Sequence, residues 1–133
     1  MKVDAVDVGG RHLGGLIVPG IHMMRDALLK GTSDIAGAHR LSTASSDGIF
    51  ANNTIGAVSR GAEFALAGLA DHAADMIAMD TGVEPKLLIT GGDGGQITAT
   101  MRRRGEIIPD LVLQGLAAIA TEASLAPVRH GTS

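Results

Sequence analysis

The sequence contains no cysteine, which excludes a disulfide framework and any metal site built from thiolates. Its five histidines do not cluster at the spacing of metal ligands, so we predict no metal site in this chain. Aromatic residues are nearly absent, with two Phe and neither Trp nor Tyr. Hydrophobic residues still make up 45% of the chain, so we expect a core of aliphatic side chains and alanine.

Long apolar runs and an excess of positive charge are also missing. No stretch approaches the roughly 20 apolar residues that a membrane-spanning helix needs. The first residues, Met1-Lys2-Val3-Asp4, lack the apolar region of a signal peptide. The net charge of −3 provides no basic surface for nonspecific nucleic-acid binding. Together these absences predict a cytoplasmic protein that binds neither a membrane nor a nucleic acid.

Glycine, by contrast, is abundant: 19 of the 133 residues are glycine, about twice the roughly 7% average usage. A chain of this length forms one modest domain. Such a glycine content indicates that backbones approach each other, or a ligand, closely.

The hydrophobic pattern predicts the order β-β-α-α-β-α-α, an α/β pattern with too few strands for a closed architecture. A strand over about 3–8 turns at Gly9-Gly10 into a hairpin partner over about 13–18. The remaining expected elements are helices over about 20–30, 54–80, 94–104 and from Pro109-Asp110 onward, a strand over 86–90, a loop over 32–51 and a flexible tail over 126–133.

Residues Thr90 to Gly95 form the turn T-G-G-D-G-G between the expected strand and the helix that follows it. A strand that ends in glycines and opens a helix directs backbone N–H groups at a ligand, and a helix N-terminus favours an anion. The alternative is a plain strand-to-helix turn in which Asp93 serves as the N-cap.

Four segments, in this order along the chain, resemble type III pantothenate kinases. They are Val6–Gly20, Asn53–Leu69, Thr90–Asp93 and Pro109–Leu116. The resemblance implies a ribonuclease H-like α/β fold of the acetate/sugar kinase, Hsp70 and actin superfamily. It also implies ATP-dependent phosphorylation of pantothenate, the first step of coenzyme A synthesis.

Three segments of that family are absent from this chain. They are the Asp-x-Gly-Asn-Thr phosphate loop, the Gly-x-Asp-Arg segment that carries the catalytic Asp, and the Asp-x-Gly-Thr-Ala segment. The last of these would stand immediately before Val3. The resemblance therefore implies an incomplete fold, with residues 1–125 as a C-terminal domain. We expect no catalytic residue and no catalysis from this chain alone, although the family uses ATP and a monovalent cation, potassium or ammonium.

The resemblance also implies individual site residues. Thr54 aligns with the threonine that contacts pantothenate, although a threonine at a helix start is also expected as a cap. Gly91 and Gly92 resemble the nucleotide-side turn. Gly14 and Gly15 could pass close to a substrate or cation, or form a bulge. The Arg102–Arg104 run, placed in the last turn of the expected 94–104 helix, could bind an anion or form a solvated helix end.

Three glycines interrupt the expected 54–80 helix, and each costs roughly 1 kcal/mol relative to alanine. Gly61, Ala65 and Gly68 lie within two turns, where a second helix backbone could approach. Because family members are dimers, we predict a homodimer centred on this helix. The alternative functions are a non-catalytic dimerising module, similar to a transcriptional accessory factor, and a fragment with no independent role.

Overall fold

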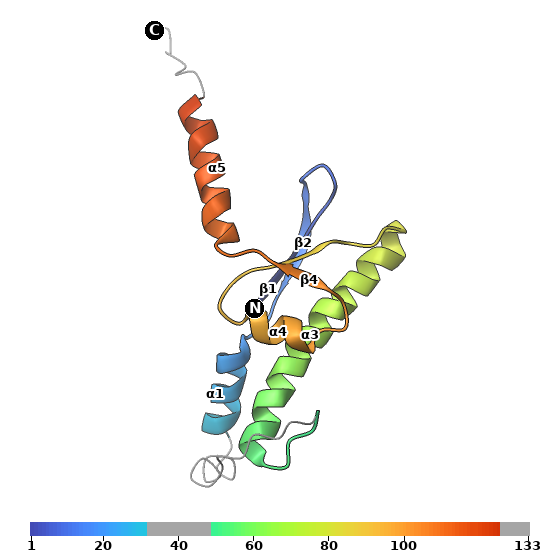
Figure 1. Cartoon of the computed structure of the whole chain (residues 1–133), viewed down its shortest axis with the longest axis vertical. Coiled ribbons are helices and arrows are strands. Elements are labelled where there is room, and N and C mark those ends of the chain that lie inside the picture. The colour runs from blue at the N-terminus through green and yellow to red at the C-terminus, as the bar shows by residue number, and fades with distance from the viewer. Residues whose placement is uncertain (32–48, 126–133) are drawn as a thin grey trace.

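The computed structural model describes residues 1–31 and 49–125 of the chain. The elements are β1 (Lys2–Val6), β2 (His12–Ile17), α1 (Ile21–Gly31), α3 (Thr54–Thr81), β3 (Leu87–Ile89), α4 (Gly94–Thr100), β4 (Gly105–Ile107) and α5 (Leu111–Leu125) (Figure 1). The prediction of a mixed α/β architecture is confirmed. Most of the expected 32–51 loop and the whole expected 126–133 tail lie outside the described residues.

The hairpin of β1 and β2 is antiparallel, as predicted. Its turn is fixed by Asp7, whose Oδ1 accepts hydrogen bonds from the backbone N–H groups of Gly9 and Arg11, both at 2.9 Å. The register shifts between Ala5 and Val6. A Cβ at Gly15 would lie 2.6 Å from the carbonyl oxygen of Val3. The irregular register and this close strand contact favour the bulge interpretation of the Gly14-Gly15 pair.

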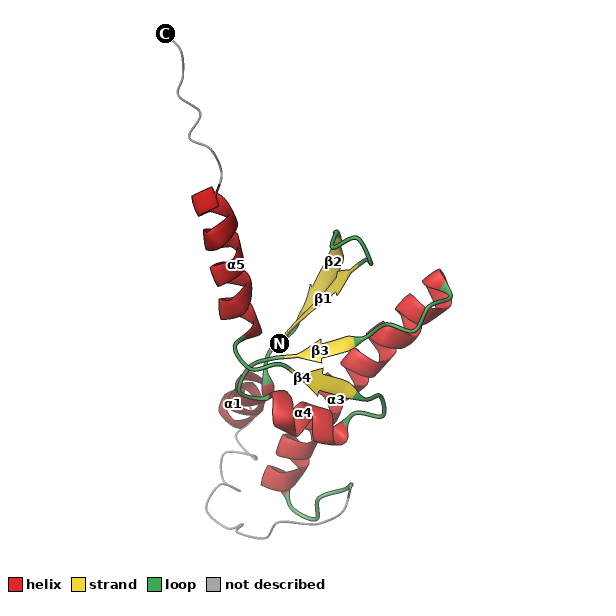
Figure 2. Ribbon diagram, turned by 45° about the horizontal axis from the view of Figure 1, so that its top comes forward, coloured by secondary structure: helices red, strands yellow, loops and turns green. Residues whose placement is uncertain are grey.

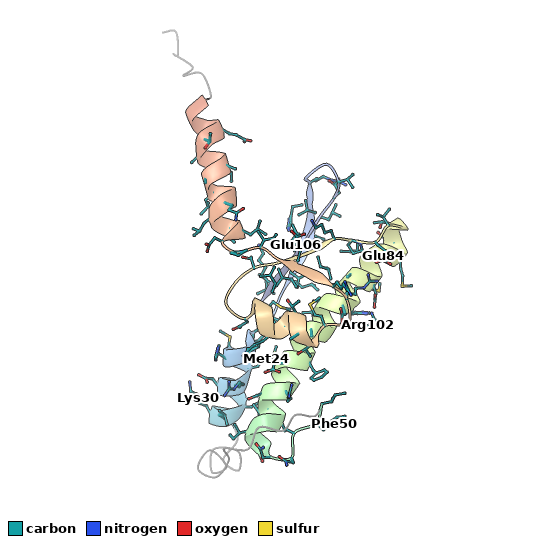
Figure 3. The ribbon with its side chains drawn as sticks, viewed as in Figure 1. Met24, Lys30, Phe50, Glu84, Arg102 and Glu106 are labelled. Atoms are coloured by element: carbon teal, nitrogen blue, oxygen red, sulfur yellow. The ribbon has the colours of Figure 1, made fainter. Side chains whose placement is uncertain are left out.

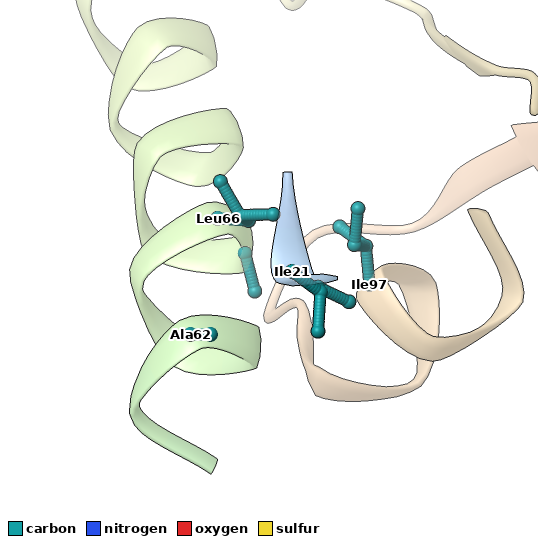
Figure 4. Packing of buried hydrophobic residues seen from close by; sticks show 5 residues of the cluster. Ile21, Ala62, Leu66 and Ile97 are labelled. Carbon is teal, nitrogen blue, oxygen red and sulfur yellow. The ribbon is translucent and has the colours of Figure 1, made fainter. Parts of the chain in front are cut away.

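The core lies where α1 and α4 pack on α3. Its buried members are aliphatic, as the composition predicts: Ile21, Ala62, Leu66, Ala67 and Ile97 (Figure 4). Both phenylalanines remain outside it, with Phe50 89% and Phe64 40% exposed.

The long helix α3 has the predicted bounds to within a residue. It begins after Asn53, which is extended (φ −142°, ψ 156°) and whose side chain accepts a hydrogen bond from the N–H of Gly56 at 2.8 Å. It ends at Gly82, which adopts the left-handed conformation at φ 70°. Both ends therefore follow from local capping chemistry.

The predicted helix over 94–104 is wrong in its second half. Helix α4 ends at Thr100, and β4 pairs in parallel with β3. The N–H groups of Arg102 and Arg103 donate to the carboxylate of Asp71 on α3, at 2.8 and 3.0 Å. These bonds replace the helical ones, because a backbone N–H held by a distant carboxylate no longer bonds the preceding turn.

Among the described residues, the strands form two separate two-stranded sheets rather than one sheet (Figure 2). Helix α5 begins after Asp110, which has a φ of 55°, and extends away from the other helices (Figures 1 and 2). Its apolar side chains Val112, Leu113, Leu116 and Ile119 are exposed. The described part of the chain thus leaves several apolar surfaces uncovered.

Candidate functional site

A groove of about 800 Å³ runs between α1 and α3. Among the described residues its lining is almost wholly apolar, and Thr54 is the one that carries a hydroxyl. The lining residues are Pro19, Met23, Met24, Ala27, Leu28, Thr54, Ala57, Val58, Gly61 and Ala62. Figure 3 shows Met24 on the α1 side of this region. Met24, Ala27 and Leu28, which recur at helical spacing on α1, are the sequence signal that could have located this wall.

Thr54 is the first residue of α3 and is exposed. The capping interpretation of this residue is wrong, because the cap is the side chain of Asn53. Within the described residues, no hydrogen bond occupies the Thr54 hydroxyl. Asn is at least as good an N-cap as Thr, so the sequence already contained this signal. The hydroxyl is thus free to meet a ligand in the groove.

The groove can hold the apolar part of a small molecule and offer it one hydroxyl. No charged side chain is part of the described lining. A ligand carboxylate would therefore need its countercharge from outside these residues, because an unpaired charge against an apolar wall is strongly disfavoured.

The glycine turn lies between β3 and α4. Gly91 adopts φ +100°, and a Cβ at Gly91 or Gly92 would meet no described atom within 4 Å. A Cβ at Gly94, in contrast, would lie 3.1 Å from Cγ2 of Ile89, so the helix start packs tightly against β3 at this glycine. The turn contributes no residue to the groove lining. No described residue covers Gly91 or Gly92, and both are exposed to solvent.

Asp93 occupies the N-cap position of α4 but makes no capping hydrogen bond through its side chain. Its carboxylate instead faces α1, where Oδ1 lies 3.9 Å from Nε2 of His22. Asp93 therefore stands at the N-cap position, as the plain-turn alternative predicts, but its side chain does not cap the helix.

Arg102 and Arg103 form an ion-pair cluster, and the run does not lie at a helix end, because α4 ends at Thr100. Arg102 donates to Asp75 at 2.6 Å, and Arg103 donates to Asp75 at 2.8 Å and also to Glu84. Hydrogen bonds from Arg103 and Arg102 hold the pKa of Asp75 below its ordinary value. Hydrogen bonds to Glu84 and Asp75 raise the pKa of Arg103. Figure 3 shows Arg102 and Glu84 near the C-terminal half of α3, which these pairs tie to the α4–β4 connection.

The hairpin carboxylates are engaged separately. Asp4 meets Nε2 of His12 at 2.9 Å and the amine of Lys2 at 3.2 Å, while Asp7 binds Arg11. The hydrogen bond from His12 is the main reason that the pKa of Asp4 is lowered.

Nowhere in 1–31 and 49–125 do three or more His, Asp or Glu residues stand together as a possible metal site. None of the described helices is long and apolar enough to cross a membrane.

Residues 1–76, more than half of the chain, match the sequence profile of the type III pantothenate kinases. The chain belongs to this family. It is 36% identical over 124 residues to the type III pantothenate kinase of Nitrosococcus oceani, covering 93% of this chain and 46% of that protein. It is 38% identical over 122 residues to the enzyme of Paracidovorax citrulli, covering 92% and 46%. The chain thus spans about half the length of the curated relatives it matches.

A solved structure has a related fold. It is a conserved Campylobacter jejuni protein described as belonging to the Baf family of transcriptional activators, with a TM-score of 0.56 and 24% identity. The match covers 94% of this chain and 54% of that one. This likeness concerns the fold alone.

Proposed function

We propose that this chain is the C-terminal half of a type III pantothenate kinase, an enzyme that phosphorylates pantothenate with ATP. The observation that carries the proposal is the match of residues 1–76 to the family profile. Relatives named type III pantothenate kinase support it, and the chain aligns with 46% of the length of the Nitrosococcus oceani protein. The proposed C-terminal domain comprises residues 1–125 and has an incomplete ribonuclease H-like α/β fold. Because the family's phosphate loop and catalytic Asp are missing, the chain alone is inactive.

In this proposal the groove between α1 and α3 forms part of the pantothenate wall, and Thr54 donates or accepts a hydrogen bond there. Two features support this role. The Thr54 hydroxyl is not used as the cap, and it borders an apolar surface. Pantothenate carries a gem-dimethyl group that suits such a surface. Its carboxylate requires a countercharge from another part of the full-length enzyme or from a second subunit.

Gly91 and Gly92 are proposed to approach the nucleotide. Their exposure and the space around them support a close backbone approach to ATP. A monovalent cation, potassium or ammonium, belongs to the same proposal. In this proposal the half of the family's sequence that the chain does not cover carries the residues that position the phosphates. Phosphoryl transfer depends on that positioning and on charge neutralisation.

The proposed assembly is a homodimer through α3. Gly61, Ala65 and Gly68 are all exposed. A Cβ at Gly61 or Gly68 would meet nothing within 4 Å among the described residues. Packing within the described chain therefore gives no reason for Gly68, whereas Gly61 also borders the groove between α1 and α3. A second α3 helix crossing at this face would give one, since small residues let two backbones approach closely.

The function is tested first in a full-length family member, at the position equivalent to Thr54. The change Thr54→Val removes one hydrogen bond at a binding site, which is worth about 1–3 kcal/mol, so pantothenate affinity falls about 5- to 150-fold. Thr54→Ser retains the hydroxyl and is the matched control. Unchanged affinity in the Val variant, measured by calorimetry, rejects the substrate role of this residue.

A second assay uses the 133-residue chain itself. Incubated with ATP and pantothenate, it forms no phosphopantothenate, because the general base and the phosphate loop are absent. Turnover clearly above a protein-free control contradicts this expectation and requires that the described residues contain a complete kinase site.

A further inference from the structure

Thr54 differs from the other helical threonines that the structure describes. In each of the others, the side-chain hydroxyl donates to the backbone carbonyl four residues earlier, at distances from 2.6 to 3.2 Å. These pairs are Thr81 with Ile77, Thr98 with Gly94, Thr100 with Gln96 and Thr121 with Ala117. A threonine hydroxyl inside a helix commonly forms such a bond. Of the described helical threonines, only Thr54 lacks it.

The position of Thr54 at the start of α3 explains this difference. The carbonyl four residues earlier belongs to Phe50, which precedes the helix, so no helical turn presents an acceptor to the hydroxyl. The N-cap is Asn53, whose Oδ1 accepts from the N–H of Gly56 at 2.8 Å and whose backbone carbonyl accepts from Ala57 at 2.9 Å. Thr54 therefore avoids both of the ways in which a helix usually occupies a threonine hydroxyl.

The surrounding residues hold Asn53 in the capping position. Its Nδ2 donates to Oδ1 of Asn52 at 3.2 Å, while its own Oδ1 binds the N–H of Gly56. A Cβ at Gly56 would lie 3.2 Å from Oδ1 of Asn53 and 2.8 Å from Cβ of Ala51, so a glycine there leaves room for the cap. Without Asn53, the next residue able to cap the helix is Thr54 itself, because threonine is also a good N-cap.

We propose that Asn53 is a positioning residue for substrate binding, because its cap keeps the Thr54 hydroxyl available to pantothenate in the groove. The inference rests on the proposed function, in which Thr54 contacts pantothenate. Thr54 belongs to the groove lining and Asn53 does not, so Asn53 acts through its neighbour. In Asn53→Ala the helix begins one residue later, and the Thr54 hydroxyl accepts the N–H of Ala57 as the new cap. The hydroxyl then turns toward the helix backbone and away from the ligand.

The first test uses the 133-residue chain and needs no ligand. By NMR, the carbon chemical shifts of Thr54 are helical in the unmodified chain. We expect them to become extended in Asn53→Ala, with faster amide exchange at Gly56. Asn53→Ser is the matched control and keeps the helical shifts, because serine caps a helix as well as asparagine does. Helical shifts of Thr54 in Asn53→Ala overturn the proposal. If that variant does not fold, extended shifts of Thr54 in the unmodified chain overturn it.

The second test measures pantothenate affinity by calorimetry in a full-length family member with Asn and Thr at the equivalent positions. Asn53→Ala weakens binding about 5- to 150-fold, the range expected for Thr54→Val, because both changes remove the same contact. The double variant binds at most about twofold more weakly than Thr54→Val alone, since residues that act through one contact are not additive. Fully additive losses overturn the proposal.

The serine variant separates positioning from direct contact in the same assay. Asn53→Ser keeps the cap but lacks the amide group, so we expect it to retain pantothenate affinity, and a loss equal to that of Asn53→Ala overturns the proposal. If Thr54→Val weakens binding and Asn53→Ala does not, the positioning role alone is refuted. If Thr54→Val binds pantothenate unchanged, the substrate role of Thr54 is refuted, while the NMR shifts still decide whether Asn53 sets the start of the helix.

Discussion

Substitution of Gly68 separates two explanations of the glycines in α3 by the sign of the effect. Gly68 is exposed, and a Cβ added there would meet no described atom within 4 Å. If the chain acts as a monomer, Gly68→Ala removes only the backbone entropy cost of glycine. If two α3 helices cross at this position, the added methyl group holds their backbones apart.

The structure fixes the size of the first effect. An alanine in place of glycine in an exposed helix interior stabilises by about 1 kcal/mol. For a chain of this size, that gain raises Tm by about 3–6 °C. Gly68→Leu gives a similar, slightly smaller gain within one subunit, because Leu is nearly as good a helix former and finds open space. In a dimer, both changes weaken association, and Leu weakens it more because its side chain is larger.

The assay combines sedimentation equilibrium with thermal denaturation at several protein concentrations. We expect the unmodified chain to be a dimer, and Gly68→Leu to be a folded monomer whose Tm no longer depends on concentration. Gly115→Leu is the matched control, since Gly115 is also an exposed helical glycine with open space, on α5. A Gly68→Leu variant with the same association state as the unmodified chain refutes the crossing. The crossing is also refuted if the unmodified chain is a folded monomer at a protein concentration on the order of tens of micromolar.

Three further changes test the description of the fold. Asn53→Ala removes the side chain that caps α3 and lowers the free energy of unfolding by about 1 kcal/mol, measured by urea denaturation. Leu66→Ala leaves a cavity in the core and costs about 2–5 kcal/mol in the same assay, so a loss under 1 kcal/mol contradicts the assigned core. Asp75 has a lowered pKa in the folded chain, so its contribution to stability is complete above the unfolded pKa and is lost as the pH falls through the folded value. The Tm difference between the unmodified chain and Asp75→Asn is therefore present at pH 7 and shrinks below about pH 4, whereas a pH-independent difference rules out the ion pairs with Arg102 and Arg103 as its cause.

The elements whose ends depend on local chemistry were predictable from the sequence. Helix α3 starts at an Asn cap and ends at a glycine in the left-handed conformation, and both signals act within a few residues. The hairpin turn is similar, because Asp7 and the glycines that follow it bond within the turn itself. The choice between Asn53 and Thr54 as the cap was harder, since adjacent residues of both types favour a helix start.

Tertiary structure decided the features that depend on residues far apart in the chain. The end of α4 is set by Asp71, 31 residues before Arg102, and no local pattern contains that bond. The groove exists only because α1 packs against α3, which brings Met23 and Thr54 to one surface. Periodicity, composition and caps thus determined the type and bounds of the long elements and the family, because these depend on local energetics and residue identity. Tertiary packing decided which carboxylate binds which backbone N–H and which helix faces are in contact. These interactions form only when segments distant in the sequence come together.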